Sequence, residues 1–123
     1  MNILILDDDV DDTTFFCEIV SETLPMARCI VENNCKDFLS TMTRYPYLPE
    51  LIFIDGFMRP LAMPECLTDI KNTLDCSHTT FIVFSGLTSE RQVAIFKKQG
   101  ADEVVCKSAT FEELRQYLLR YAD

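Results

Sequence analysis

Basic side chains are scarce in this sequence. Its 123 residues include 11 lysines and arginines against 20 aspartates and glutamates, and the formal net charge is -9. Contact with the phosphates of a nucleic acid needs clustered lysine and arginine, so this balance argues against nucleic-acid binding. It argues equally against docking on an anionic membrane surface. Cationic ligands, metal ions and basic partner surfaces stay open.

Long apolar segments and a basic leader are also missing. No stretch approaches the roughly 18 apolar residues of a transmembrane helix. The first apolar run stops at Asp7, and the first basic residue is Arg28, so no signal peptide is indicated. These absences predict a cytoplasmic protein with no membrane segment.

The six cysteines form no Cys-x-x-Cys pair, and His78 is the single histidine. His78 with the nearby Cys76 supplies half of a zinc site at best. In a cytoplasmic protein the cysteines are expected to be reduced thiols, several of them filling core positions.

The length suits one domain covering residues 1–123. Short apolar segments rich in β-branched residues, leucine and phenylalanine alternate with longer amphipathic segments. The segments predict strands at 2–6, 27–31, 51–54, 81–84 and 103–106, and helices at 11–24, 36–44, 65–74, 89–99 and 110–121. Capping boxes are predicted at Ser89 and Thr110, and a helix end at Gly100. This alternation predicts an α/β fold with a parallel sheet and helices on both faces.

Polar residues stand directly after the predicted strands. They are Asp7, Asp8 and Asp9 after the first strand, Asp55 after the third, Ser85 after the fourth and Lys107 after the fifth. In such sheets, ligands bind beyond the carboxyl ends of the strands, where the strand order reverses. With the strand order 2-1-3-4-5, these side chains would converge on one cleft.

The chemistry of such a cleft follows from its charges. Two carboxylates 4 Å apart repel each other by about 4 kcal/mol at an effective dielectric constant near 20. A bound cation offsets this cost, and oxygen ligands suit Mg²⁺. A carboxylate beside a metal, an ammonium and a hydroxyl describes a phosphoryl-transfer site with aspartate as nucleophile. Each residue alone is more typical of a helix cap, a turn or a solvated surface, so the prediction depends on their joint occurrence.

The same segments carry a resemblance to a known family. They are residues 3–6 leading to Asp7, Asp8 and Asp9, residues 51–54 leading to Asp55 with Met58 three positions on, residues 81–84 leading to Ser85 and Gly86, and residues 100–102 leading to Lys107. Over essentially its whole length the sequence resembles the receiver domain of two-component response regulators. The resemblance implies a flavodoxin-like αβα sandwich with the strand order 2-1-3-4-5.

The resemblance also implies a metal site. Mg²⁺ would be held by Asp8, by Asp55 and by the backbone carbonyl of Phe57, with Asp7 bound through a water molecule. The phenyl ring of Phe57 could limit the attack of water on a phosphorylated Asp55.

A phosphoryl site is implied beside the metal. Asp55 would accept a phosphoryl group from a sensor histidine kinase or a histidine-containing phosphotransfer protein, and Lys107 and Ser85 would bind phosphoryl oxygens. An output protein that the sequence does not identify would receive the signal by protein contact or onward phosphotransfer. The domain, a monomer or weak dimer, would assist its own phosphorylation and dephosphorylation without being an enzyme with a separate substrate.

Several residues depart from the family pattern. Arg59 and Ser108 stand where prolines are common, and Met63 where glycine is usual. A cis bond before Ser108 would cost about 3 to 4 kcal/mol, so strain or an altered Lys107 geometry is expected. Val104 replaces the usual switch aromatic, so the coupling of the hydroxyl to that ring cannot work in its usual form.

Two alternative functions stay open. The run from Asp7 to Val10 also fits the first motif of haloacid-dehalogenase-type phosphatases, with Asp7 as the nucleophile and Ser85 and Lys107 as later motifs. That reading leaves Asp55 without a role. Alternatively, the domain would be a scaffold without phosphorylation chemistry, docking a partner through the aromatic residues of its last helix, of which Tyr121 is the candidate for exposure.

Overall fold

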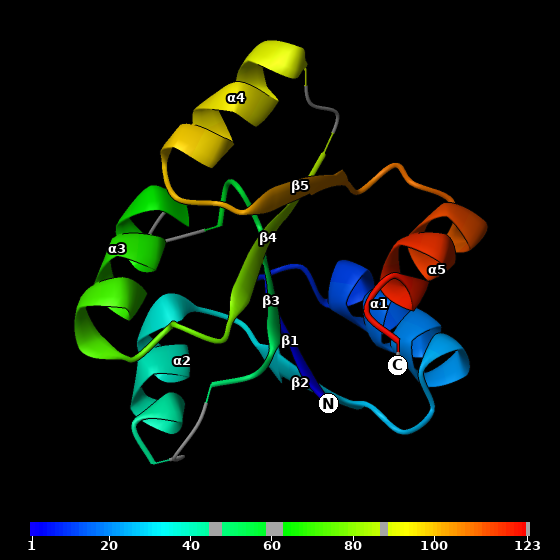
Figure 1. Cartoon of the computed structure of the whole chain (residues 1–123), viewed down its shortest axis with the longest axis horizontal. Coiled ribbons are helices and arrows are strands. Elements are labelled where there is room, and N and C mark those ends of the chain that lie inside the picture. Colours follow the sequence, from blue (N-terminus) through cyan, green and yellow to red (C-terminus); the bar gives the residue numbers. More distant parts are fainter. Residues whose placement is uncertain (45–47, 59–62, 87–88, 123) are drawn as a thin grey trace.

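The computed structural model describes residues 1–44, 48–58, 63–86 and 89–122. Over these residues, strands and helices alternate along the chain (Figure 1). The strands are β1 (Asn2–Leu6), β2 (Arg28–Glu32), β3 (Leu51–Ile54), β4 (Thr80–Ser85) and β5 (Glu103–Cys106). The helices are α1 (Val10–Thr23), α2 (Cys35–Met42), α3 (Met63–Thr73), α4 (Glu90–Lys98) and α5 (Phe111–Leu119). The predicted α/β architecture is confirmed. The majority of the helix and strand ends differ from the prediction by one or two residues, and the others agree with it.

The strands form one parallel sheet in the order β2-β1-β3-β4-β5, as predicted. The register places the carboxyl ends of the strands close to level: Leu6 pairs with Ile54, and Ile54 pairs with Val83. Between β4 and β5, Ser85 pairs with Cys106. The residues that follow β1, β3 and β5 therefore meet at one edge of the sheet.

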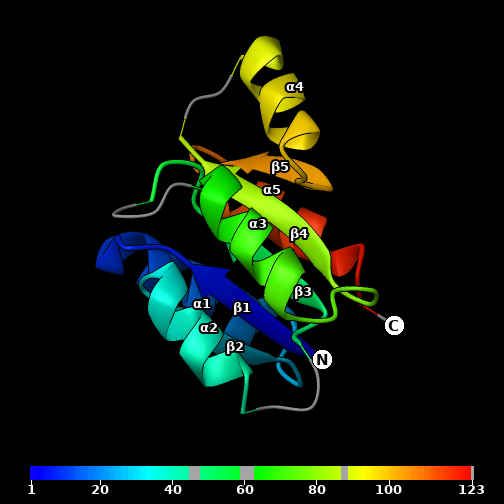
Figure 2. The ribbon, with the colours of Figure 1, turned by 90° about the vertical axis from the view of Figure 1, so that its left-hand side faces the viewer.

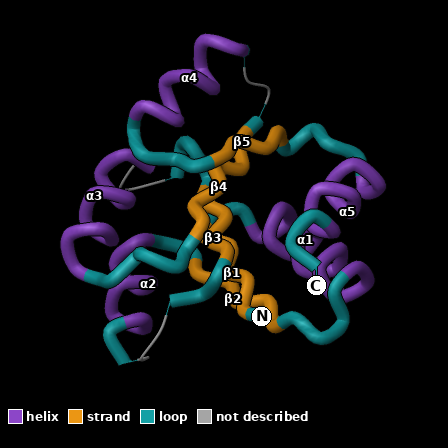
Figure 3. The backbone as a smooth tube through the Cα atoms, in the orientation of Figure 1, coloured by secondary structure: helices purple, strands orange, loops and turns teal. Residues whose placement is uncertain are grey.

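Helices cover both faces of the sheet. In Figures 1 and 3, α1 and α5 lie on one side of the strands and α2 and α3 on the other, while α4 lies beyond β5. Because neighbouring residues of a strand point to opposite faces, each strand contributes to both layers of the core. Ile3 and Ile5 pack in the layer of α1 and α5, whereas Leu4 and Leu6 pack in the layer of α2 and α3. This double coverage explains why the strands are apolar without alternation.

The capping box predicted at Thr110 is confirmed, whereas the one predicted at Ser89 is only half formed in the described residues. Thr110 and Glu113 form the full capping box at the start of α5. The Ser89 hydroxyl caps α4 by accepting a hydrogen bond from the backbone N–H of Gln92. After α4, Gly100 has a φ of 116°, a conformation that glycine adopts at little cost. Among the helices of the described ranges, none is both long and apolar enough to cross a membrane.

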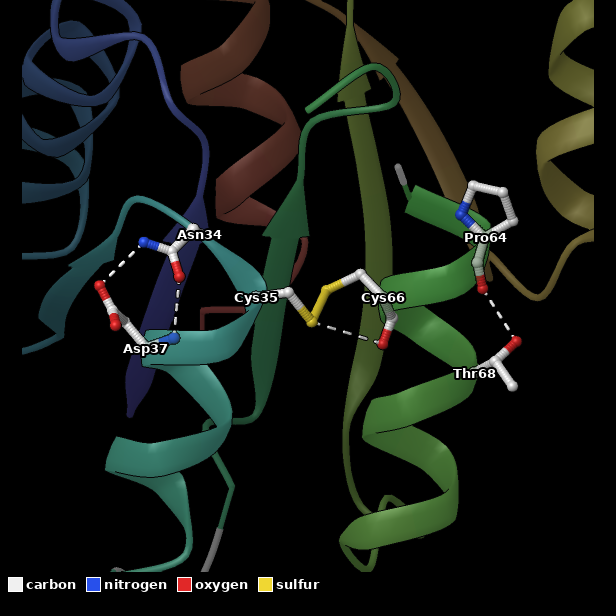
Figure 4. The surroundings of a disulfide bond; sticks show 6 residues. All are labelled: Asn34, Cys35, Asp37, Pro64, Cys66 and Thr68. Carbon is white, nitrogen blue, oxygen red and sulfur yellow. Dashed lines mark hydrogen bonds between the residues drawn. A yellow bond between two sulfur atoms is a disulfide. The ribbon is translucent and has the colours of Figure 1, made fainter. Parts of the chain in front are cut away.

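Two cysteines form a disulfide bond, which the sequence-based expectation of reduced thiols did not foresee. Figure 4 shows the bond between Cys35, at the start of α2, and Cys66, on α3. The two Cα atoms are 5.8 Å apart although 31 positions separate the residues in the sequence. The expectation is wrong for this pair because nothing in the spacing reveals that α2 and α3 lie side by side on one face of the sheet, as Figure 2 shows. Among the described residues, Cys17, Cys29 and Cys76 keep free thiols.

Candidate functional site

Three carboxylates gather at the carboxyl edge of the sheet. Asp7 and Asp8 directly follow β1, and Asp55 directly follows β3. One carboxylate oxygen from each lies within 4.8 Å of the other two. Asp7 is fully buried, Asp55 is almost buried and Asp8 is exposed. The predicted convergence of these three residues is confirmed.

The Asp7 carboxylate is held at both of its oxygens. Oδ1 accepts a hydrogen bond of 2.9 Å from the backbone N–H of Asp9, and Oδ2 lies 2.7 Å from Nζ of Lys107. Burial raises the pKa of Asp7 to about 6. The ion pair with Lys107 and the hydrogen bond from Asp9 oppose this rise, and the charge of Asp55 adds to it. Asp7 is therefore an ion held in a site that disfavours negative charge.

Lys107 is the cation of the site. Its ammonium nitrogen lies 2.7 Å from Asp7, 2.7 Å from Asp12 and 3.7 Å from Asp55. Burial lowers the pKa of Lys107, but its hydrogen bond to Asp12, its ion pair with Asp7 and the charge of Asp55 outweigh burial, so the net effect is a raised pKa. The backbone N–H of Lys107 donates to the carbonyl of Ser85, which extends the pairing of β5 with β4 past the end of the strand. Lys107 therefore reaches the predicted pocket although Ser108 replaces the usual proline.

Asp12 is a member of the site that the sequence reasoning missed. It lies in the first turn of α1, and its Oδ2 accepts a hydrogen bond from Lys107. The signal was the spacing from the acidic run: Asp12 is the third residue after Asp9, the residue that caps α1. That spacing places the Asp12 backbone N–H within reach of the Asp9 side chain and brings the Asp12 carboxylate to the same end of the helix.

The turn after Asp55 is tight. Oδ1 of Asp55 accepts a hydrogen bond of 3.1 Å from the backbone N–H of Phe57. A Cβ atom at Gly56 would lie 2.5 Å from the ring of Phe96 on α4, so only glycine fits there without a shift. Phe57 is an exposed residue whose ring lies edge-on to that of Phe96, with 5.7 Å between the ring centroids. The predicted departure at Arg59 lies outside the described residues, whereas Met63 begins α3 as a buried residue.

Ser85 has a buried side chain at the end of β4. Its Oγ has no hydrogen-bond partner within the described part of the chain. A Cβ atom at Gly56 would lie 3.0 Å from this Oγ, which places the hydroxyl beside the turn that follows Asp55. A buried hydroxyl that lacks a partner costs free energy, and this one lies beside the turn that follows Asp55.

The donor set fits a magnesium ion. Mg²⁺ prefers oxygen ligands at 2.0–2.1 Å, and two ligands of one octahedral ion lie at most about 4.2 Å apart. The separations of up to 4.8 Å among Asp7, Asp8 and Asp55 are compatible with two direct ligands and a third reached through water. Three carboxylates against one ammonium leave negative charge that a divalent cation would offset.

Comparison with solved structures identifies the architecture. The BeF3-activated DrrB receiver domain matches 97% of this chain and 94% of its own, with a TM-score of 0.78 and 22% identity. The Vibrio cholerae chemotaxis protein CheY4 matches 97% and 96%, with a TM-score of 0.81 and 16% identity. This chain has the receiver-domain fold. The Mn²⁺-bound response regulator Rcp1 has the same fold, covering 95% of this chain and 88% of its own at a TM-score of 0.75 and 17% identity. No family model and no curated protein sequence matches the chain.

Proposed function

We propose that the protein is a phosphoacceptor receiver, in which Asp55 takes a phosphoryl group and thereby signals. One observation carries the proposal: the Asp55 carboxylate belongs to an acidic cluster fit for a cation and lies 3.7 Å from the ammonium of Lys107. The Asp55 side chain keeps 12% exposure, so a donor can reach it. Receiver folds reported with bound Mn²⁺ and with BeF3 activation support the same reading.

The chemistry follows from these groups. A carboxylate oxygen of Asp55 would attack the phosphorus of a phosphohistidine or of a small acyl phosphate, and the bond from phosphorus to the leaving nitrogen or oxygen would break. The product would be an acyl phosphate on Asp55. Lys107 would pair with the oxygens of the transferred group, and the Ser85 hydroxyl would donate to one of them.

The metal would be held by Asp8, Asp55 and the backbone carbonyl of Phe57, with Asp7 acting through a water molecule. When bound, Mg²⁺ supplies positive charge that reduces the repulsion between the carboxylates and an anionic donor. In this assignment the groups that assist the transfer lie in the same domain as Asp55, the group that is modified. We therefore propose a signalling domain that assists its own modification and not an enzyme with a separate substrate.

The phosphatase alternative fits the site less well. It requires Asp7 to attack a substrate, but the Asp7 side chain has 0% exposure, and both of its oxygens are engaged. The more accessible carboxylate is that of Asp55, which the alternative leaves unused.

The proposed partners are a sensor histidine kinase or a histidine-containing phosphotransfer protein as donor, and an output protein that reads the phosphorylated state. We place the protein in the cytoplasm as one domain over residues 1–123, a monomer or weak dimer. Cytosolic thiols are normally kept reduced, so the Cys35–Cys66 disulfide would form there only under oxidising conditions.

Labelling with acetyl phosphate tests the proposal. We expect intact-protein mass spectrometry to detect one phosphoryl adduct in the wild type with Mg²⁺ and none after chelation by EDTA. The Asp55→Asn variant should stay unlabelled, while Asp69→Asn, which removes an exposed aspartate of α3, should be labelled like the wild type. Equal labelling of wild type and Asp55→Asn would refute the assignment.

A further inference from the structure

Asp12 lies closer to the ammonium group of Lys107 than Asp55 does. The Asp12 carboxylate lies 2.7 Å from Lys107 Nζ, whereas the Asp55 carboxylate lies 3.7 Å from it. A lysine ammonium has three N–H donors, and here two oxygens at hydrogen-bonding distance, one on Asp7 and one on Asp12, engage it. The ammonium of Lys107, which a phosphoryl group on Asp55 would need as its partner, is therefore paired with Asp7 and Asp12.

The start of α1 fixes this pairing. The Asp9 side chain caps the helix by accepting a hydrogen bond of 3.0 Å from the Asp12 backbone N–H, which holds the Asp12 backbone in place. A residue at this third helical position often reaches back to the backbone N–H of the capping residue. Here the Asp9 N–H donates to Asp7 instead. The Asp12 carboxylate is thus available to Lys107.

The two carboxylates that hold Lys107 differ in how readily they can release it. The Asp7 side chain has 0% exposure, so losing Lys107 would leave a buried charge without its counterion. The Asp12 side chain is 36% exposed, so water can replace the ammonium there. An ion pair that is open to solvent is worth little, and Asp12 is the partner that Lys107 can leave at the lower cost.

We propose that Asp12 is a positioning residue that holds Lys107 away from Asp55 until a phosphoryl group draws the ammonium across the pocket. This inference rests on the proposed role of Asp55 as phosphoacceptor. In the resting protein, Lys107 belongs to Asp7 and Asp12. In the phosphorylated protein, it keeps Asp7 and exchanges Asp12 for a phosphoryl oxygen. Asp12 therefore weakens the binding of a phosphoryl group and slows phosphorylation.

The test uses beryllofluoride, a stable mimic of the phosphoryl group, with Mg²⁺ present, and measures its affinity for the full chain by ¹⁹F NMR. We expect Asp12→Asn to bind the mimic about two- to fivefold more tightly, which corresponds to about 0.4–1 kcal/mol at 1.36 kcal/mol per tenfold. Asp12→Glu keeps the carboxylate and should stay close to the wild type. Asp11→Asn is the matched control, since it removes the same charge from the neighbouring exposed residue of the same helix turn. Circular dichroism verifies that each variant is folded.

A variant without the lysine separates the positioning of Lys107 by Asp12 from simple repulsion between the Asp12 carboxylate and the bound mimic. In Lys107→Met, no ammonium is left to hold, so adding Asp12→Asn should no longer tighten the binding of the mimic. An equal gain with and without Lys107 would overturn the proposal, because Asp12 would then act only through its charge.

Labelling by acetyl phosphate distinguishes a failure of the positioning role of Asp12 from a failure of the proposed function of Asp55. A wild type that is labelled, together with an Asp12→Asn variant that binds the mimic like the wild type, refutes only the positioning role. A wild type that is never labelled at Asp55 refutes the proposed function and the positioning role together. Faster labelling of Asp12→Asn than of Asp11→Asn supports both.

Discussion

Asp7 and Lys107 form an ion pair in which the carboxylate is closed to solvent. Oδ2 lies 2.7 Å from Nζ, and the Asp7 side chain has 0% exposure. Burial raises the pKa of Asp7 from its ordinary value of 3.8 to about 6 in spite of the ion pair with Lys107. An acid whose pKa is raised by folding destabilises the fold when it ionises. This cost is absent below about pH 4, grows as the pH rises, and is complete above about pH 6.

Asp7→Asn should therefore stabilise the metal-free protein at neutral pH. A rise in pKa from 3.8 to about 6 corresponds to about 3 kcal/mol of unfolding free energy, a net figure that already includes the pairing with Lys107. Urea unfolding in EDTA, monitored by circular dichroism, measures the difference between variant and wild type. We expect the advantage of Asp7→Asn to be largest at pH 7.5 and to shrink as the pH falls towards 4. A difference that does not change with pH would contradict the raised pKa.

Mg²⁺ should stabilise the folded protein through the acidic cluster. A ligand that binds only the folded state adds about 1.4 kcal/mol at ten times its dissociation constant. Thermal unfolding with increasing Mg²⁺ should show a rising midpoint for the wild type and a much weaker response for Asp8→Asn. Asp11→Asn removes the same charge from an exposed residue nearby and should respond like the wild type. Equal responses of Asp8→Asn and Asp11→Asn would exclude a site centred on Asp8.

Gly56 should tolerate no side chain. A Cβ atom there would lie 2.5 Å from the Phe96 ring, so Gly56→Ala should destabilise the fold by about 1–3 kcal/mol through overpacking. Gly86 offers a matched control, because a Cβ atom added there meets no atom within 4 Å in the described part of the chain. Urea unfolding should give a clear loss for Gly56→Ala and almost none for Gly86→Ala. Similar losses for both variants would mean that Phe96 does not close over the turn after Asp55.

The disulfide should make stability depend on reductant. Cross-linking residues separated by 31 positions restricts the unfolded chain, an effect worth about 3–4 kcal/mol in the chain-entropy description. Unfolding of the oxidised wild type should occur at lower urea concentration after a thiol reductant is added. Cys35→Ser should unfold at the same urea concentration with and without reductant, whereas Cys76→Ser, which changes a free thiol, should keep the dependence. A wild type that is indifferent to reductant would argue against the bond.

The fold was largely predictable because its signals are local. Apolar segments such as 51–54 need cover on both faces, and the amphipathic segments between them supply it. Thr110 and Glu113 mark a helix start through atoms only three residues apart, and the structure has that capping box. Element ends were less accurate where several polar residues can serve as the cap. In the acidic run after β1, Asp9 takes that place, so α1 begins at Val10.

The sequence predicted which carboxylates gather at the candidate site, but not which of them pair with Lys107. Asp7, Asp8 and Asp55 could be expected to meet because each follows a strand of one parallel sheet, and all such strands end at the same edge. Which carboxylate holds Lys107 depends on side-chain reach across the pocket. Asp55, which the family resemblance puts at the centre, lies farther from the ammonium than Asp12, which the sequence reasoning left without a role.

The amino-acid sequence was enough to predict the alternation of strands and helices, the caps of α4 and α5 and the acidic residues that follow the strands. These features depend on periodicity and on neighbours a few positions apart. Three contacts became visible only in the folded chain: Asp12 shares Lys107 with Asp7, Phe96 closes over Gly56, and Cys35 meets Cys66. Each of these contacts joins segments far apart in the chain, and its geometry is set by how helices settle on the sheet, which no local pattern encodes.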